Sequence, residues 1–402
     1  MRLPGNPSRH LTYCLNIHPG ESLEDVRAAI ATHAAAVKRR VAPQVPFGVG
    51  LRLGAVAAAE LGDPSALAAL RRLLDDHDLY AFTINGFPFG RFHKTRVKAQ
   101  VYLPDWRDAG RLDYTVQLAH ILASLLPEDV TGSISTVPLG YKPLASDPVL
   151  LPVMTANLAR CAVELDRIRL KHGRTIVLAL EPEPDCLLER TDEVIHYFNT
   201  TLLRDGAGIV AEMAGCGTSR AEALLRTHIG ICLDACHAAV EFEEPAAMLR
   251  ALHAEGIRIP KIQVSAALET DAGPAAEAAL RPFVDMVYLH QTRMVFPNGS
   301  RLEFPDLDDA VFARLKTATG GLARVHFHVP LFYTGSTVLR STSRMTAELL
   351  RYLHTTQIAA DLEVETYTFS VLPPDVAGAD VDSCIVGELN WTLNAMDANR
   401  RS

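Results

Sequence analysis

The sequence contains no long apolar run and no paired-cysteine motif. No apolar stretch approaches the roughly 20 residues that a helix needs to cross a bilayer, and the first residues lack the apolar segment of a secretory signal. The seven cysteines are an odd number, show no CxxC spacing and lie mostly inside apolar segments, which indicates buried free thiols in a reducing compartment. We therefore expect a cytoplasmic protein without a membrane span.

Basic residues are also scarce. The chain has 39 Lys and Arg against 47 Asp and Glu, a formal net charge of −8 at pH 7, and its pI is about 6.0. No run of lysines or arginines of the kind that neutralises a phosphate backbone is present. The composition therefore argues against a nucleic-acid partner.

Short β-rich runs alternate with helical patterns along most of the chain. The helical patterns carry start signals, such as the capping-box pair Ser22 and Asp25 and the cap and proline of Asp63 and Pro64. The β-rich runs cover 11–18, 47–54, 80–87, 132–140, 175–184, 229–237 and 261–268. Later helices are predicted over about 149–171, 192–203, 219–227, 245–254, 275–284, 309–317 and 343–354. Apolar strands separated by helices predict a parallel sheet covered by helices.

A doubly wound sheet and a (β/α)8 barrel both satisfy this pattern. The repeat runs to eight units without a linker, and no GxGxxG turn follows any strand, so the barrel is favoured. We predict a single domain over 1–402 with an insertion at about 284–340, between strands seven and eight. This insertion would hold a hairpin over 284–304 and a strand over 323–332, before a last barrel strand within 361–373. A C-terminal helix at about 384–400 should pack on the barrel exterior.

Acids and histidines gather where the predicted strands end, which in such barrels is the face that carries the active site. They are Glu181, Glu183, Asp234, His237, His326, His328, Glu363 and Glu365. Any one of them can be a salt bridge or a helix cap, as an Asp after a strand often is. Together they predict a bound divalent cation, Mn²⁺, Zn²⁺, Co²⁺ or Mg²⁺, since buried carboxylates need compensation. Cys232 and Cys236 are interpreted as buried small residues rather than ligands.

Long segments of the chain resemble one family. The runs "HLTYCLNIHPGES", "NGFPFGRFHKTRVKAQVYLPDW", "GSISTVPLGYKP", "ICLDACHAA", "VHFHVPLF" and "LEVETYTFSVLP" are similar to the EboE family, called a metabolite traffic protein. This family lies within the xylose isomerase-like TIM-barrel superfamily, which includes sugar isomerases, ketose epimerases and endonuclease IV. The resemblance covers almost the whole chain.

The resemblance implies a metal site formed by the carboxylates of Glu181, Asp234 and Glu365. Gln263 stands where the superfamily has a histidine ligand on strand seven, and its carbonyl would ligate a hard cation more weakly. His328 is included among the ligands because His326 and His328 occupy a place comparable to the Asp-x-His pair of the nuclease branch. One ion, or two, would be bound.

The resemblance also bears on the reaction. The nuclease branch has histidines on strands three and four, where this chain has Asn85 and either Ser135 or Thr136, and this argues against DNA repair. The epimerase branch implies a sugar or cyclitol isomerase or epimerase. In such an enzyme Glu181 and Glu365 would accept and donate the proton, and His237 or His328 would orient the substrate.

Further residues are expected to contact the substrate. They are Asn85, His93, Lys98, His326 and Glu363. The basic loop around His93 and Lys98 could recognise a phosphate or carboxylate, or be an ordinary solvated loop. The expected partner is a small polyol or metabolite precursor, together with other Ebo-cluster proteins. A non-catalytic accessory role in the same pathway, and an endonuclease IV-like phosphoesterase, stay open as alternatives.

Overall fold

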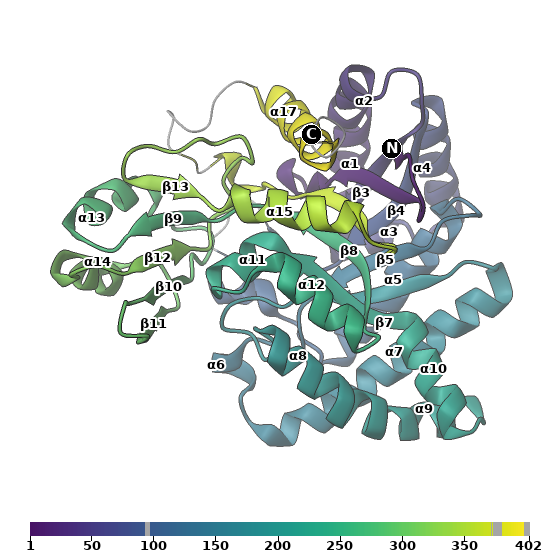
Figure 1. The fold of residues 1–402 in the computed structure, drawn as a ribbon. Helices are drawn as coiled ribbons and strands as arrows, with labels where there is room; N and C mark the ends of the chain where they lie inside the picture. Colours follow the sequence, from purple (N-terminus) through teal and green to yellow (C-terminus); the bar gives the residue numbers. More distant parts are fainter. Residues whose placement is uncertain (93–96, 371, 373–379, 398–402) are drawn as a thin grey trace.

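Eight parallel strands form a barrel at the centre of the computed structural model, which describes residues 1–92, 97–370, 372 and 380–397 (Figure 1). The sheet order is β1-β2-β14-β8-β7-β6-β5-β4-β3, in which the short β1 (Arg2–Leu3) pairs antiparallel with β2. The eight barrel strands are β2 (Arg9–Tyr13), β3 (Phe47–Arg52), β4 (Leu79–Asn85), β5 (Gly132–Thr136), β6 (Ile176–Leu180), β7 (Ile229–Asp234), β8 (Arg258–Val264) and β14 (Asp361–Val364). The predicted (β/α)8 barrel is confirmed.

The barrel closes between β2 and β3 through an isolated bridge rather than a regular strand pair. Cys14 and Gly50 form an isolated parallel bridge. The hydroxyl of Thr12 donates to the carbonyl of Gly48 at 2.7 Å and accepts from the backbone N–H of Gly50 at 3.1 Å. A side chain therefore takes over part of the hydrogen bonding that a longer strand pair would supply.

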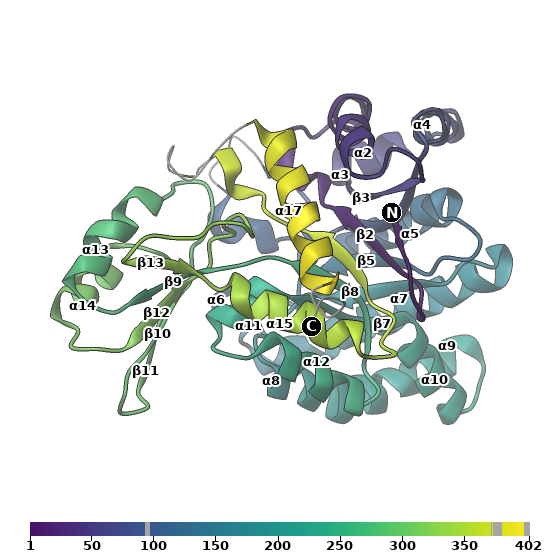
Figure 2. The ribbon, with the colours of Figure 1, turned by 45° about the horizontal axis from the view of Figure 1, so that its top comes forward.

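Helices cover the outside of the barrel, as crossovers between parallel strands require (Figures 1 and 2). The predicted capping box of Ser22 and Asp25 begins α1, and Asp63 caps α4. The helices between barrel strands are α1 (Leu23–Ala29), α2 (Ala35–Val41), α3 (Ala55–Glu60), α4 (Pro64–Asp76), α5 (Ala109–Leu125), α6 (Lys142–Ala145), α7 (Leu151–His172), α8 (Thr191–Tyr197), α9 (Ala207–Ala214), α10 (Thr218–His228), α11 (Ala235–Val240), α12 (Pro245–Ala254) and α15 (Ser343–His354).

One segment, Pro148–His172, is long and apolar enough to pass a length and composition test for a membrane span. Half of its most apolar window is buried inside the fold. Its helix α7 packs between α5 and α9 in the layer around the barrel. Packing within the fold therefore accounts for its apolar side chains.

A second sheet is inserted between barrel strands seven and eight, as predicted. Its order is β11-β10-β12-β9-β13, all antiparallel, and α13 (Pro274–Leu280) and α14 (Asp309–Thr317) accompany it (Figure 1). The strands are β9 (Leu268–Asp271), β10 (Thr292–Val295), β11 (Arg301–Phe304), β12 (Leu322–Val325) and β13 (Leu339–Ser341). The sheet begins at Leu268, before the predicted start near 284, because β9 follows β8 closely enough to look like its continuation. The strand predicted over 323–332 ends at Val325.

The C-terminal helix α17 (Val381–Asp397) lies across the outside of the barrel, against α15 and α2 (Figure 2). It begins slightly before the predicted position near 384. The last predicted positions, 398–400, lie outside the described residues.

The barrel interior is polar beneath its carboxyl-end face. Lys261 on β8 and Glu363 on β14 are fully buried and form an ion pair, and the Lys261 amine also donates to Ser135 Oγ at 3.2 Å. Gly50 makes room for this pair, because a Cβ at that position would collide with the Glu363 carboxylate and lie 2.8 Å from the Tyr13 carbonyl oxygen. The glycine is therefore a packing requirement of the buried ion pair.

We predict that Gly50→Ala lowers the free energy of unfolding by about 1–3 kcal/mol, the usual cost of overfilling a packed core. Urea unfolding followed by circular dichroism measures this change. Gly208→Ala in α9 is the matched control, because a Cβ there meets nothing within 4 Å and alanine is the better helix former. An unchanged urea midpoint in Gly50→Ala would contradict this prediction, because it would show that the ion pair accommodates the methyl group without loss of stability.

Candidate metal centre

Three carboxylates meet at the carboxyl-end face of the barrel. Glu181 follows β6, Asp234 is the last residue of β7 and Glu365 follows β14. All three are buried, and one oxygen of each lies within 4.8 Å of those of the other two. Glu181 Oε2, Asp234 Oδ2 and Glu365 Oε2 are buried without a hydrogen-bond partner. This arrangement matches the ligand set of a divalent cation.

Each of two acids is held through one oxygen, which leaves the other facing the cluster. Asp234 Oδ1 caps helix α11 by accepting from the backbone N–H of His237 at 2.9 Å, and it also accepts from Ser265 Oγ at 2.9 Å. Glu365 Oε1 accepts from the side-chain amides of Asn16 at 2.6 Å and Asn85 at 2.9 Å. Asp234 can therefore cap helix α11 and bind a cation at the same time, because the cap uses Oδ1 and a cation would use Oδ2.

The electrostatics of this cluster are unfavourable without a cation. Burial raises the pKa of Glu181, and the carboxylates of Glu365 and Asp234 raise it further. Burial likewise raises the pKa of Glu365, with Glu363 and Asp234 adding to the effect, and the buried amine of Lys261 opposes the shift in both. Buried charges of one sign persist only with a counter-charge, so the donor set fits a metal ion.

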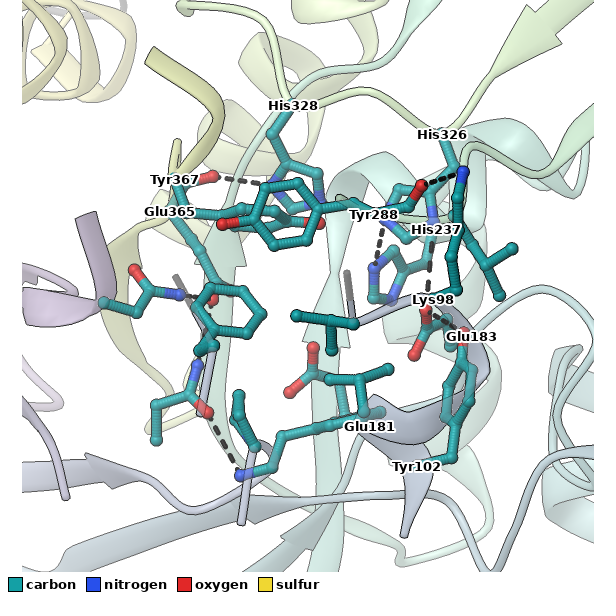
Figure 3. A pocket seen from close by; sticks show the side chains of 18 residues that line it. Lys98, Tyr102, Glu181, Glu183, His237, Tyr288, His326, His328, Glu365 and Tyr367 are labelled. Carbon is teal, nitrogen blue, oxygen red and sulfur yellow. Dashed lines mark hydrogen bonds and ion pairs between the residues drawn. The ribbon is translucent and has the colours of Figure 1, made fainter. Parts of the chain in front are cut away.

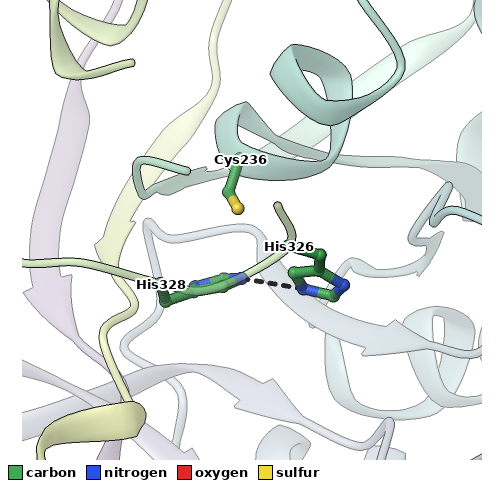
Figure 4. Close-up of side chains that lie close together, drawn as sticks. All are labelled: Cys236, His326 and His328. Atoms are coloured by element: carbon green, nitrogen blue, oxygen red, sulfur yellow. Dashed lines mark hydrogen bonds between the residues drawn. The ribbon is translucent and has the colours of Figure 1, made fainter. Parts of the chain in front are cut away.

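Three imidazoles form a second cluster beside the carboxylates (Figures 3 and 4). His237 Nε2 lies 3.1 Å from His326 Nε2, which lies 3.2 Å from His328 Nε2. The Nδ1 atoms face oxygens instead: the Pro182 carbonyl at 2.9 Å for His237, Gln291 Oε1 at 2.7 Å for His326 and the Glu365 carbonyl at 2.7 Å for His328. Because these oxygens only accept, each Nδ1 carries the hydrogen in the neutral ring.

His326 Nε2 faces the Nε2 atoms of both His237 and His328. Burial lowers the pKa of His237 to about 4 and that of His326 well below its ordinary value, so these two rings carry no proton on Nε2 at neutral pH. A histidine whose Nδ1–H is held by an oxygen and whose Nε2 is free has the usual arrangement of a metal ligand. The second cluster therefore also fits a cation.

Two further side chains reach the histidines. Glu183 offers an oxygen within 4.8 Å of the ligand nitrogens of His237 and His326, and Cys236 Sγ is equally close to those of His326 and His328 (Figure 4). Burial raises the pKa of the Cys236 thiol, so it stays protonated unless a metal displaces the proton. Cys232 instead donates from Sγ to Gln263 Oε1 at 3.1 Å.

The remaining predicted residues take different positions. Asn85 lines the cavity but holds Glu365. The Lys98 amine is occupied by Asp306 Oδ2 and the carbonyl of Tyr288, both at 2.6 Å, and by the carbonyl of Asp285 at 2.9 Å. His93 lies outside the described residues.

Two predicted residues do not face the cavity as expected. Glu363 was expected to bind substrate, but it does not line the cavity, because it lies one layer deeper in the barrel and pairs with Lys261. Gln263 was expected to ligate through its oxygen, but this oxygen takes the Cys232 thiol, and the unpartnered atom is Nε2. In this arrangement Gln263 presents no ligand atom.

A cavity of about 60 Å³ lies over both clusters, roughly the liquid volume of two water molecules. Figure 3 shows Glu365 and the pair His237 and His326 on opposite sides of it. Phe92, Tyr288 and Tyr367 line the cavity with ring centroids 5.1–5.3 Å apart, and the Tyr367 ring lies 4.8 Å from that of His328. The cavity fits an ion and a few waters, and these aromatic side chains form part of its wall.

Several residues that shape the site had no signal in the sequence. Asn16 and Ser265 bind the carboxylates, and Tyr102 and Gln291 bind Glu183 and His326. These side chains are uncharged and their positions depend on loops and on the inserted sheet. Only the placement of Asn16 and Ser265 just beyond strands marked them as near the active face.

Comparison with known proteins identifies the fold. No family model matches the sequence, and no curated protein matches it. Among solved structures, a D-tagatose 3-epimerase-like protein is 12% identical to this chain, and the match covers 97% of this chain and 99% of that protein with a TM-score of 0.50. The IolI protein with a bound zinc atom is 13% identical, and the match covers 97% of this chain and 98% of that protein with a TM-score of 0.45. The probable 3-DHS dehydratase AsbF of petrobactin synthesis from Bacillus anthracis is also 13% identical, and the match covers 96% of this chain and 99% of that protein with a TM-score of 0.44. The match to the epimerase-like protein agrees with the (β/α)8-barrel fold.

We predict that the purified protein binds Co²⁺ or Mn²⁺ and that Glu181→Gln and Asp234→Asn each weaken binding by at least about tenfold, because a charged ligand is lost. Equilibrium dialysis with elemental analysis measures both stoichiometry and affinity. Glu164→Gln on the outer face of α7 is the matched control. Equal binding by all four proteins would rule out the carboxylate site.

Proposed function

We propose that this protein is a divalent-metal-dependent isomerase or epimerase acting on a sugar, a cyclitol or a related polyol. The observation that carries this proposal is the set of three buried carboxylates at the carboxyl end of the barrel, each with an unpartnered oxygen, of which Glu181 and Glu365 line a cavity. Glu181, Asp234 and Glu365 would hold one ion, and His237, His326 and His328 would hold a second. The barrel type supports this reading, since active sites of such barrels lie at this face.

A divalent cation bound here would polarise a carbonyl and stabilise negative charge on its oxygen and on a neighbouring hydroxyl. The protein's own groups would move the protons. Glu181 and Glu365 come from strands separated by β7 and β8, so they can face a bound carbon from different directions. Burial and neighbouring carboxylates raise the pKa of both groups above the usual range, which favours their holding a proton taken from the substrate.

Other side chains would prepare the site for this transfer. Asn16 and Asn85 fix the carboxylate of Glu365 through its Oε1, which leaves Oε2 directed at the substrate position. Phe92, Tyr288 and Tyr367 would exclude water from it once substrate is bound. His237 would orient the substrate where its Nε2 is not occupied by an ion.

The pathway is also part of the proposal. The resemblance to EboE proteins supports a role in a cytoplasmic secondary-metabolite pathway, with a metabolite precursor as substrate and other Ebo-cluster proteins as partners. The alternative in that pathway is a metal- and metabolite-binding accessory protein. The three-histidine cluster adds a further candidate, since two ions side by side also suit phosphoester hydrolysis.

The test is exchange of solvent deuterium into carbon-bound positions of a panel of ketoses and inososes, followed by NMR with the Co²⁺- or Mn²⁺-loaded protein. We expect exchange with one member of the panel and a loss of at least about 100-fold in Glu365→Gln, the typical contribution of a general acid or base. Glu164→Gln should exchange at the wild-type rate.

Three results would contradict the proposal. Wild-type exchange in Glu365→Gln would remove that residue from proton transfer. Binding of metal and of a polyol without exchange would favour the accessory role. Cleavage of abasic-site DNA by the loaded protein would favour the phosphoesterase.

A further inference from the structure

The inserted sheet places a glutamine beside the second cluster. The register of β10 and β12 pairs Thr292 with Val325, and it continues one step beyond both strands, where the backbone N–H of His326 donates to the carbonyl of Gln291 at 2.8 Å. Gln291 is fully buried. Its side chain and that of His326 then meet, with His326 Nδ1 at 2.7 Å from Gln291 Oε1.

The orientation of the Gln291 amide is determined by its other partners. Its Nε2 donates to the Pro184 carbonyl at 3.1 Å and to the Tyr102 hydroxyl at 2.9 Å. A carbonyl only accepts, so the atom facing Pro184 is the amide nitrogen, and the atom facing His326 is the oxygen. His326 therefore carries its hydrogen on Nδ1, and its Nε2 lone pair faces the other two histidines.

The chain of hydrogen bonds continues to an acid of the site. The Tyr102 hydroxyl, having accepted from Gln291, donates to Glu183 Oε1 at 2.8 Å. Tyr102 is held in place by stacking on Tyr141, with ring centroids 4.5 Å apart and planes 1° from parallel. Gln291 is thus anchored from the barrel side while it belongs to the inserted sheet.

His326 differs from its two neighbours in how its tautomer is set. His237 and His328 donate from Nδ1 to backbone carbonyls, which no substitution removes. His326 alone among the three depends on a side chain. A change at Gln291 therefore acts directly on His326, and through Tyr102 on Glu183, whereas the printed hydrogen bonds of Asp234 and Glu365 do not involve Gln291.

We propose that Gln291 is a positioning residue that keeps His326 in the Nδ1–H tautomer and so makes it a ligand of the second cation. This inference rests on the proposed metal-binding function. In this proposal the inserted sheet is part of the metal centre, because it supplies both His326 and Gln291, which orients the His326 ring. Ligand orientation by such a partner contributes roughly 10- to 100-fold to metal affinity.

The test compares Gln291→Leu, Gln291→Glu and the matched control Gln117→Leu, whose glutamine makes a hydrogen bond to Ala58 on the barrel exterior. Co²⁺ titration by equilibrium dialysis gives the number and affinity of bound ions. Nitrogen NMR of histidine-labelled, metal-free protein gives the His326 tautomer. Thermal unfolding checks that each variant folds.

We expect two ions in the wild type and in Gln117→Leu. Gln291→Leu should bind the first ion with unchanged affinity and the second roughly 10- to 100-fold more weakly, and His326 should lose its exclusive Nδ1–H form. Gln291→Glu keeps an acceptor for Nδ1–H and should retain the second ion. Unchanged affinity for the second ion in a folded Gln291→Leu would overturn the proposal.

Failure of the underlying function gives a different result. A wild-type protein that binds no ion would end the proposed metal-dependent function, and the tautomer would still decide the role of Gln291. In that case an Nδ1–H ring at His326 in Gln291→Leu would overturn the positioning role as well.

Discussion

The structure depends on how it buries a group of carboxylates and a group of imidazoles at the carboxyl end of the barrel. Glu181, Asp234 and Glu365 each have an unpartnered oxygen and each offer an oxygen within 4.8 Å of those of the other two, and the Nε2 atoms of His237 and His328 both lie close to that of His326. Each group alone is costly to bury. Their convergence fits cations between them, and without cations burial raises the pKa of Glu181 and Glu365 and lowers that of His237 and His326.

Much of the surrounding structure serves to hold these groups in place. Asn16, Asn85 and Ser265 each bind one carboxylate oxygen and leave the other free. Beneath them, the ion pair of Lys261 and Glu363 brings a positive charge into the barrel interior and occupies the space that Gly50 leaves. The buried polar groups of the barrel interior therefore help to hold the carboxylates of the site above them.

The inserted sheet belongs to the same design. It supplies His326 and His328 from the end of β12 and, through the register with β10, places Gln291 against His326. In the epimerase-type reading this sheet also contributes Tyr288 to the aromatic cover of the cavity. A barrel without the insertion would keep the three carboxylates but lose two of the three imidazoles.

The sequence by itself determined the barrel and the carboxylate corners of the site. Alternating apolar strands and helices define a parallel sheet, and Glu181, Asp234 and Glu365 stand where strands end, so topology alone brings them to one face. Tertiary structure alone decided the rest. Glu363 and Glu365 are two residues apart at the end of the last barrel strand, yet Glu363 pairs with Lys261 a layer below Glu365. Gln263 turns its oxygen to Cys232, and Gln291 reaches His326 only through an antiparallel register that no local pattern encodes. Side-chain hydrogen bonds between distant segments depend on how those segments pack, and this information lies in no single stretch of the chain.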